Sequence, residues 1–288
     1  MAHRASVVCV GSAILDTIAL VDRLPGEDQR VEADQVVIAG GGNASTSAVA
    51  IARLGVDVEF SGIVGDDEAG ATVLAQLEAE GVGTSLVERR AGVETSHSVV
   101  VVSRESGARA ILTRPAVTPD RIPSGFDWVH VDKAGYRALA QGGRISSAVS
   151  LDDGNPVPGL DLNLIDLYVP TAIVLRERFP GQSAEDGARE ALRLGTTTVV
   201  ATDGAHGSFA ATRDQLVHSP GLPITPLSTL GAGDVFHGAL LAAIVLGKPL
   251  QEAIRFANVT AALSCRALDG RSGIPDRTEV EAALSDLP

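Results

Sequence analysis

Short segments rich in β-branched residues alternate with longer segments rich in alanine and leucine along most of this 288-residue chain. The short segments predict buried β-strands and the longer ones predict helices. Strands that alternate with helices predict an α/β fold with a doubly wound, mostly parallel sheet, which binds ligands at the carboxyl ends of its strands. The predicted strands are residues 7–10, 58–64, 129–131, 147–151, 172–175 and 197–201. The predicted helices are residues 44–54, 68–80, 183–194, 231–246 and 250–268.

Two segments, residues 12–37 and 93–115, interrupt this alternation. In the second, β-branched residues 96–103 and residues 109–113 flank the turn sequence Glu105-Ser106-Gly107, which is typical of a hairpin. We interpret both segments as strands of a small β-sheet lid, inserted into a single domain that spans residues 1–288.

Composition limits what the chain can bind. Hydrophobic residues make up 45% of the chain and aromatic residues only 3%, so the core must consist mainly of aliphatic side chains. The formal net charge of −13 argues against nucleic acid as a partner, because a phosphate backbone requires a basic face. A small anion such as ATP remains compatible, since backbone amides and one or two cations can hold it.

The cysteines and the apolar segments indicate the compartment. Cys9 and Cys265 are far apart in apolar surroundings, which predicts two free buried thiols and no disulfide. The apolar stretch at residues 7–10 is too short for the core of a signal peptide, and no stretch is long enough to span a membrane. We therefore expect a cytoplasmic protein without a membrane partner.

Residues 228–234, Ser-Thr-Leu-Gly-Ala-Gly-Asp, place a carboxylate among small residues where a predicted helix begins. The glycines let the backbone approach a ligand closely. The amides of Gly231, Ala232, Gly233 and Asp234 would point outward at the helix N-terminus, where the helix dipole favours an anion. A carboxylate in the same turn suits a base beside a phosphoryl group in transfer. The alternative is an ordinary helix start, since aspartate is common in a first turn.

This segment resembles the C-terminal signature of the ribokinase/PfkB carbohydrate kinase family, which usually reads D-T-x-G-A-G-D-x-F. The run Gly41-Gly42-Asn43-Ala44-Ser45 resembles the N-terminal signature of the same family, in the right order and at a fitting separation. The resemblance extends over nearly the whole chain. It implies an ATP-dependent sugar kinase in which Asp234 is the general base and the amides of residues 231–234 form an anion hole for the transferred phosphoryl group.

The resemblance also assigns binding residues. Asp16 stands where the family binds sugar hydroxyls, and a turn aspartate is the alternative. Gly41, Gly42 and Asn43 match the sugar-binding loop, although Asn43 would also suit a helix N-cap. On the nucleotide side, the resemblance assigns the loop residues Asp203, Gly204 and Gly207, and the helical residue Asn258.

Two departures from the family pattern bear on its metal ions. The strand near Pro170 usually carries N-x-x-E, but this chain reads Pro-Thr-Ala-Ile-Val at residues 170–174. Ketohexokinase-like members also lack that motif, so Mg²⁺ would be held mainly by the ATP phosphates and water, and no residue is assigned as a metal ligand. Ser228 replaces the aspartate that helps hold a monovalent cation in ribokinase-like members, so the resemblance does not extend to potassium dependence.

The residues leave the sugar open. The run Gly-Gly-Asn-Ala-Ser resembles ketohexokinase-like members and favours a ketose, whereas residues 234–240, 255–257 and 270–276 also resemble sulfofructose kinase-like members. An anionic sugar would need cations, for which Arg109, Arg114 and Lys133 are the candidates. We also expect His97, on the lid, to contact the ligand more readily than His237.

Other functions remain as alternatives. A nucleoside kinase would need an aromatic platform for the base, which this chain is poor in. A catalytically silent sugar-binding regulator would have no need for Asp234. A dinucleotide-binding dehydrogenase would need a run of glycines after Gly11, which is absent. An exposed strand edge on the lid favours a homodimer.

Overall fold

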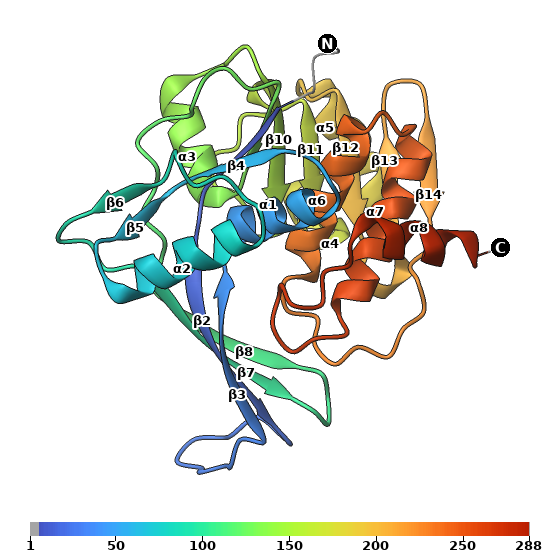
Figure 1. Cartoon of the computed structure of the whole chain (residues 1–288). Helices are drawn as coiled ribbons and strands as arrows, with labels where there is room; N and C mark the ends of the chain where they lie inside the picture. Colours follow the sequence, from blue (N-terminus) through green and yellow to red (C-terminus); the bar gives the residue numbers. More distant parts are fainter. Residues whose placement is uncertain (1–5, 288) are drawn as a thin grey trace.

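The computed structural model describes residues 6–287 and contains one large sheet, two small ones and eight α-helices within that range. Residues 1–5 and 288 of the predicted domain lie outside the described part. The large sheet has eight strands, which are parallel except for the antiparallel edge pair β13 and β14 (Figure 1). In spatial order they are β14 (Leu216–Ser219), β13 (Ser208–Ala211), β12 (Thr198–Thr202), β11 (Leu167–Pro170), β10 (Ala148–Asp153), β9 (Trp128–Val131), β1 (Val7–Val10) and β4 (Val58–Ser61).

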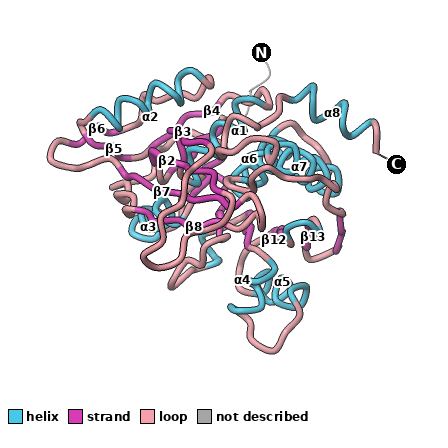
Figure 2. The backbone as a smooth tube through the Cα atoms, turned by 90° about the horizontal axis from the view of Figure 1, so that it is seen from below, coloured by secondary structure: helices cyan, strands magenta, loops and turns pink. Residues whose placement is uncertain are grey.

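Helices cover both faces of the large sheet, because its strands are apolar on both sides. One core combines side chains from one face with the helices α1 (Asn43–Arg53), α2 (Glu68–Ala79), α6 (Ala232–Val245), α7 (Leu250–Ser264) and α8 (Arg277–Ser285). The other core combines the opposite face with α3 (Lys133–Gly142), α4 (Ala172–Arg178) and α5 (Ala184–Arg193). Figure 2, seen from below, shows α6 and α7 on one side of β12 and β13 and α4 and α5 on the other.

A four-stranded sheet projects from this body as a lid (Figure 1). Its order is β3 (Gln35–Gly41), β2 (Ile14–Val21), β7 (Ser96–Ser103) and β8 (Arg109–Thr113), with β2 and β7 parallel. Its inner face buries Ile18 and Val100 against Leu268, with Leu230 packed beside them. The predicted small sheet is thereby confirmed, although β3 extends to Gly41, beyond the predicted segment 12–37. The inner face of the lid packs on Leu230, just before α6, and on Leu268, after α7.

Two predicted strands were wrong in detail. Residues 172–175 begin helix α4, because Thr171 caps that helix by accepting a hydrogen bond from the amide of Val174. The strand of that region is β11, which ends at Pro170. Residues 58–64 form two strands, β4 and β5 (Ile63–Gly65), and β5 pairs with β6 (Glu88–Arg90) in a separate small sheet. Gly62 separates the two strands, and a Cβ there would lie 2.7 Å from the carbonyl oxygen of Gly11.

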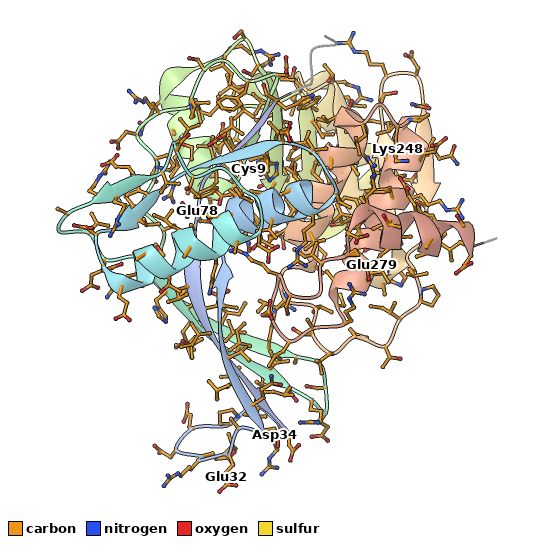
Figure 3. The ribbon with its side chains drawn as sticks, viewed as in Figure 1. Cys9, Glu32, Asp34, Glu78, Lys248 and Glu279 are labelled. Carbon is orange, nitrogen blue, oxygen red and sulfur yellow. The ribbon has the colours of Figure 1, made fainter. Side chains whose placement is uncertain are left out.

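The remaining elements agree with the sequence pattern, apart from their ends. Helix α7 ends at Ser264 and not at residue 268, and the predicted ranges did not include β6, α3, β13, β14 or α8. Cys9 and Cys265 are both free and buried, as expected, and Figure 3 shows Cys9 within the main body. In the part of the chain that the structure describes, no helix is long and apolar enough to cross a membrane.

Candidate active site

The N-terminus of α6 has no side-chain cap. Its N-cap residue, Gly231, adopts a left-handed conformation with φ of 74°, and a Cβ there would lie 2.8 Å from the Cα of Gly270. Only glycine fits this turn without strain. A Cβ at Gly233 would meet no described atom within 4 Å, so the first turn of α6 faces open space. Uncapped amides that face open space fit a phosphate group.

The glycine loop that ends β3 lies directly against Asp16. A Cβ at Gly41 would lie 2.0 Å from Oδ2 of Asp16, so the carboxylate occupies the place of a side chain at Gly41. Gly42 is the N-cap of α1, with φ of 97°, and no side chain caps the helix there. Asn43 is therefore the first helical residue and not the N-cap, which leaves its side chain free to face other groups.

The side chain of Asn43 joins the two predicted signatures. Its Nδ2 donates hydrogen bonds to Oδ1 of Asp234 at 2.8 Å and to Oδ2 of Asp152 at 3.1 Å. The hydroxyl of Ser47, one turn further along α1, donates to the backbone oxygen of Asp234 at 2.9 Å. The start of α1 therefore holds both the side chain and the backbone of Asp234.

Asp16 and His97 lie on opposite faces of the lid sheet. Asp16 on β2 is directly opposite Ser98 on β7, is only 9% exposed and lies on the inner face. Since side chains alternate along a strand, His97 points to the outer face, where its Nε2 lies 3.2 Å from Oγ1 of Thr17. Burial raises the pKa of Asp16, against the lowering effects of its hydrogen bond with Ser98 and of the Arg271 charge. We leave His97 out of the proposed site because it does not face Asp16.

Burial and neighbouring carboxylates raise the pKa of Asp234 to about 8. After burial, the largest contribution comes from the charge of Asp152, with smaller ones from Asp132 and Asp16. The nearby His237 acts in the opposite direction. A carboxyl group with its pKa near neutrality can accept a proton efficiently and release it again.

The predicted nucleotide loop lies between β12 and β13. Gly204 and Gly207 both have positive φ, and a Cβ at Gly207 would lie 2.2 Å from the carbonyl oxygen of Ser219. Asn258 on α7 donates through Nδ2 to that same carbonyl oxygen at 3.1 Å. Gly207 and Asn258 thus meet at the end of β14, and Asp203 lies 3.3 Å from His206 at the start of the loop.

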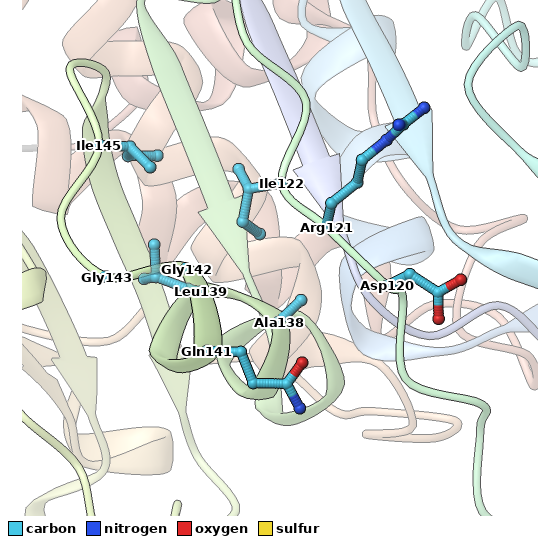
Figure 4. Close-up of a pocket in the computed structure, with 9 residues that line it drawn as sticks. All are labelled: Asp120, Arg121, Ile122, Ala138, Leu139, Gln141, Gly142, Gly143 and Ile145. Carbon is cyan, nitrogen blue, oxygen red and sulfur yellow. The ribbon is translucent and has the colours of Figure 1, made fainter.

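The three predicted cations do not converge. Arg114 pairs with the exposed side chain of Glu94. Arg109 on β8 donates to Oγ1 of Thr229 at 2.7 Å, just before the start of α6. Lys133 lines a depression of about 410 Å³ beside α3, together with Thr118, Tyr136 and Arg137. A second depression of about 280 Å³ lies along the same helix, with Asp120, Arg121 and Gln141 among its lining residues (Figure 4). None of the other predicted site residues lines either depression.

Comparison with known proteins decides the family. The family model described as "pfkB family carbohydrate kinase" matches residues 4–157 and 163–277. The chain belongs to the pfkB family of carbohydrate kinases. The prediction of an ATP-dependent carbohydrate kinase, made from the two signatures, is thereby confirmed.

Individual pfkB relatives match along almost their whole length. The ribokinase of Bacillus subtilis (strain 168) is 28% identical over 295 residues, which cover 97% of this chain and 99% of that protein. The ketohexokinase of Mus musculus is 26% identical over 295 residues, which cover 93% of this chain and 98% of that protein. The structure of Arabidopsis thaliana ribokinase complexed with ribose and ATP superposes with a TM-score of 0.80 at 24% identity, covering 99% of both chains. The predicted ribokinase-like fold is therefore confirmed.

Three residues of this pfkB kinase lie in the site but were not among the predicted ones. Asp152, at the end of β10, accepts from Asn43 and lies 3.0 Å from Nε2 of His237. Arg271 is only 5% exposed and donates to the carbonyl oxygen of Gly41 at 2.9 Å and to Oγ of Ser45 at 2.8 Å. Burial lowers the pKa of Arg271 to about 10, opposed by the charge of Asp16.

Sequence signals for these three residues were weak. Asp152 comes after a strand, at the edge where ligands bind, and could have been found on that ground. His237 and Arg271 lie inside the segments that resemble the family, but the sequence does not show which residues they contact. Their place in the site is evident only from their hydrogen-bond and charge partners in the folded structure.

The two departures from the family pattern have a local explanation. Where other members carry N-x-x-E, the chain turns from β11 into the cap of α4 at Thr171. Ser228 is buried, and its hydroxyl accepts a hydrogen bond from the amide of Leu230 at 3.1 Å. Within residues 6–287, no group of three or more His, Cys, Asp or Glu side chains is arranged to hold a metal ion.

Proposed function

We propose that this pfkB kinase transfers the γ-phosphoryl group of MgATP to a hydroxyl group of an uncharged sugar, with Asp234 as the general base. One observation carries the proposal. The carboxylate of Asp234 lies in the first turn of an uncapped helix and is hydrogen-bonded to Asn43, which follows the glycine loop against Asp16. A phosphate-binding helix end and a hydroxyl-binding loop thus meet at one carboxylate.

The proposed reaction follows from these positions. Asp16 and the glycine loop accept hydrogen bonds from sugar hydroxyls and turn one hydroxyl toward Asp234. Asp234 takes the proton of that sugar hydroxyl, and the hydroxyl oxygen forms a bond to the γ-phosphorus of ATP. The bond between the γ-phosphorus and the β,γ-bridging oxygen breaks, and that oxygen leaves with ADP. The first amides of α6 stabilise the charge on the transferred group.

Mg²⁺ would enter this site with ATP. It neutralises the phosphate charge and keeps several water ligands, so it does not require a dedicated cage of protein carboxylates. That property fits a chain without N-x-x-E at residues 170–174. The loop of Asp203, Gly204 and Gly207, with Asn258 behind it, is the proposed wall for the nucleotide.

We infer an uncharged pentose or ketohexose as the acceptor. Relatives are named ribokinase, ketohexokinase and deoxyribokinase, and one solved ribokinase is complexed with ribose and ATP. Arg109 is engaged with Thr229, Arg114 pairs with Glu94, and Lys133 lines a separate depression. None of these three predicted cations is therefore an evident partner for an anionic sugar beside Asp16. This arrangement does not favour sulfofructose as the substrate.

The deciding experiment is ATP consumption across a panel of pentoses, ketohexoses, aldohexoses, sulfofructose, sugar phosphates and nucleosides. We expect turnover with one neutral pentose or ketohexose and slow ATP hydrolysis without sugar. Turnover with sulfofructose alone would overturn the inference of a neutral acceptor. Sugar binding without any turnover would instead support a silent sugar-binding protein.

The ionisation of Asp234 predicts a pH dependence. The base must be deprotonated to accept a proton, and its pKa is raised to about 8 by burial and the charge of Asp152. We therefore expect kcat/KM, measured with subsaturating sugar and MgATP, to rise with pH and to be half-maximal near that value. Below it, kcat/KM should fall about tenfold per pH unit. A profile that stays flat down to pH of about 5 would mean that Asp234 ionises like an ordinary aspartate.

We propose that two copies pair through the outer face of the lid. A cross-strand row there combines Thr17 with three exposed apolar side chains, of which Ile38 is 63%, Val99 46% and Leu112 65% exposed. Figure 3 shows charged residues, Glu32 and Asp34, at the far tip of the lid. A second copy would cover these exposed apolar side chains, which water otherwise contacts.

Replacing Ile38 by aspartate tests the lid dimer. We expect the wild type to sediment as a dimer at micromolar concentration and the Ile38→Asp variant as a monomer. The matched control is Ile173→Asp on α4, whose side chain is 59% exposed away from the lid. A monomeric wild type, or a variant that stays dimeric, would contradict the proposal. The cytoplasmic location and the single domain over residues 1–288 stay predictions.

A further inference from the structure

A buried charged pair lies behind Asp234. Oδ1 of Asp152, on β10, lies 3.0 Å from Nε2 of His237, and their side chains are only 3% and 4% exposed. His237 is three residues after Asp234 on α6, so it shares the helix of the proposed base. The amide of Gly154 also donates to Oδ1 of Asp152, at 2.8 Å, and fixes that carboxylate at the end of its strand.

A single amide nitrogen connects this pair to Asp234. Nδ2 of Asn43 carries two hydrogens, and it donates to Oδ2 of Asp152 and to Oδ1 of Asp234. An amide holds two carboxylates at a fixed separation but does not exchange protons with either at neutral pH. The orientation of Asp234 therefore depends on where Asp152 holds Asn43.

The charges around Asp234 are unequal. Three carboxylates face it, Asp16 from β2, Asp132 from the end of β9 and Asp152 from β10, and His237 opposes them from its own helix. Arg271 lies behind the glycine loop, and its positive charge interacts with the carboxylates of Asp16 and Asp234. His130, on β9, has its ring centroid 6.0 Å from that of His237, and burial lowers its pKa to about 3, so it stays neutral.

Each member of the pair favours the charged form of the other. Burial disfavours ionisation of Asp152, but the charge and the hydrogen bond of His237 hold the pKa of Asp152 well below its usual range. Burial would likewise lower the pKa of His237, but the charge and the hydrogen bond of Asp152 raise it instead. Asp152 therefore favours a negative charge beside Asp234, and His237, in contact with Asp152, favours a positive charge that opposes it.

We propose that Asp152 and His237 are positioning residues of the phosphoryl transfer, which together fix the orientation of Asp234 through Asn43 and balance the charge that decides its ionisation. The proposal rests on the proposed role of Asp234 as the base. The two residues act in opposite directions, because one adds a negative charge beside the base and the other a positive charge.

Opposite shifts of the pH profile are the distinguishing result. Asp152→Asn keeps an acceptor for Asn43 but removes the negative charge, so the acid limb of kcat/KM should move down by about one pH unit. His237→Gln keeps a donor toward Asp152 but removes the positive charge, so the limb should move up by about one unit. The double variant should return close to the wild-type position, with a lower kcat because the hydrogen bonds are less well oriented.

The same shifts can be measured without turnover. A ¹³C NMR titration of the Asp234 side-chain carboxyl, assigned by its loss in Asp234→Asn, reports its ionisation directly in the full-length protein. The matched control is the exposed pair of His218 and Glu185, whose side chains lie 3.3 Å apart. His218→Gln and Glu185→Gln should leave both the titration and the pH profile unchanged.

The outcomes separate the inference from the proposed function. Opposite shifts in the two variants support the inference, whereas equal shifts, or lost activity with an unmoved titration, overturn it and leave the pair a structural role. If Asp152→Asn does not fold, as judged by circular dichroism, His237→Gln still decides the question. An upward shift of the Asp234 titration in that variant supports the inference, and an unmoved titration overturns it. If Asp234→Asn keeps full turnover, the proposed base is wrong, whatever the pair does.

Discussion

Replacing Asp234 by asparagine is expected to lower kcat about 10³-fold, because general base catalysis contributes a factor of this order. Asparagine has nearly the same shape but cannot accept the proton of the sugar hydroxyl at neutral pH. It can still accept the hydrogen bond that Asn43 now donates to Oδ1 of Asp234, so the glycine loop should keep its place. The dissociation constants of sugar and ATP should therefore change little, and calorimetry with each ligand measures them separately from turnover.

The same variant should be more stable than the wild type. The folded pKa of Asp234 is raised to about 8 by burial and by the charge of Asp152, above its value in the unfolded chain. At acid pH the carboxyl is protonated in both states and does not affect the free energy of unfolding. As pH rises from the unfolded pKa toward the folded pKa, the carboxyl ionises more readily in the unfolded chain, so the free energy of unfolding decreases. Asparagine does not ionise, so the gain in Tm should be absent near pH of about 4 and largest above about 8. A control variant, Asp186→Asn on the exposed start of α5, should keep full turnover.

A decrease of kcat smaller than tenfold would assign the base to another group. Asp152, Asp132 and Asp16 are the candidates, since the charges of all three act on Asp234. An unchanged Tm at every pH would show that Asp234 is ionised in the folded protein without cost. The two measurements are independent, so the role of the residue in catalysis and its ionisation can each be rejected alone.

Local signals predicted much of the fold and the centre of the site. The glycines of residues 231–234 and the glycine loop before Asn43 define backbone conformations that few other residues adopt, so their meaning is readable in the sequence. The parallel sheet follows from alternation of strands and helices. The sequence also predicts that Asn43 and Asp234 lie in one site, and in the structure Nδ2 of Asn43 lies 2.8 Å from Oδ1 of Asp234.

The structure differs from other expectations where a single neighbour decides the outcome. The apolar residues 172–175 suit a strand or a buried helix equally, and the cap made by Thr171 selects the helix. Asn43 suits an N-cap, but the left-handed φ of Gly42 moves the cap back by one residue. His97 lies beside the inward-facing Ser98, so the pleat of β7 turns it away from Asp16. None of these choices is visible in composition or periodicity.

Contacts between distant segments could not be predicted from the sequence. Asp152 and His237 lie far apart in the chain, and their ion pair exists only because β10 ends beside α6. Arg271 reads as one basic residue in a loop after α7. Its hydrogen bonds to Gly41 and Ser45 show that it supports the glycine loop from behind. A Cβ at Gly40 would lie 2.2 Å from Nη1 of Arg271, so the same loop needs glycine on that face as well.

Replacing Gly41 by alanine is expected to raise the KM for the sugar about 100-fold, since a displacement of about 1 Å in a binding group costs that much. The new Cβ would lie 2.0 Å from Oδ2 and 2.7 Å from Cγ of Asp16. Asp16 is only 9% exposed and lies opposite Ser98, so the carboxylate has little room to move. Either Asp16 or the end of β3 must shift, and the sugar would lose its alignment with Asp234.

The effect should be confined to the sugar if the proposed site is right. The KM for ATP should stay within a factor of two or so of the wild type, because the α6 amides do not depend on Gly41, and overpacking should cost about 1–3 kcal/mol of stability. The matched control is Gly142→Ala at the end of α3, where a Cβ would meet no described atom within 4 Å. An unchanged KM for the sugar in Gly41→Ala would remove Asp16 from the binding site. An equal rise in both KM values would indicate a general loss of structure, because only the sugar should depend on the contact between Gly41 and Asp16.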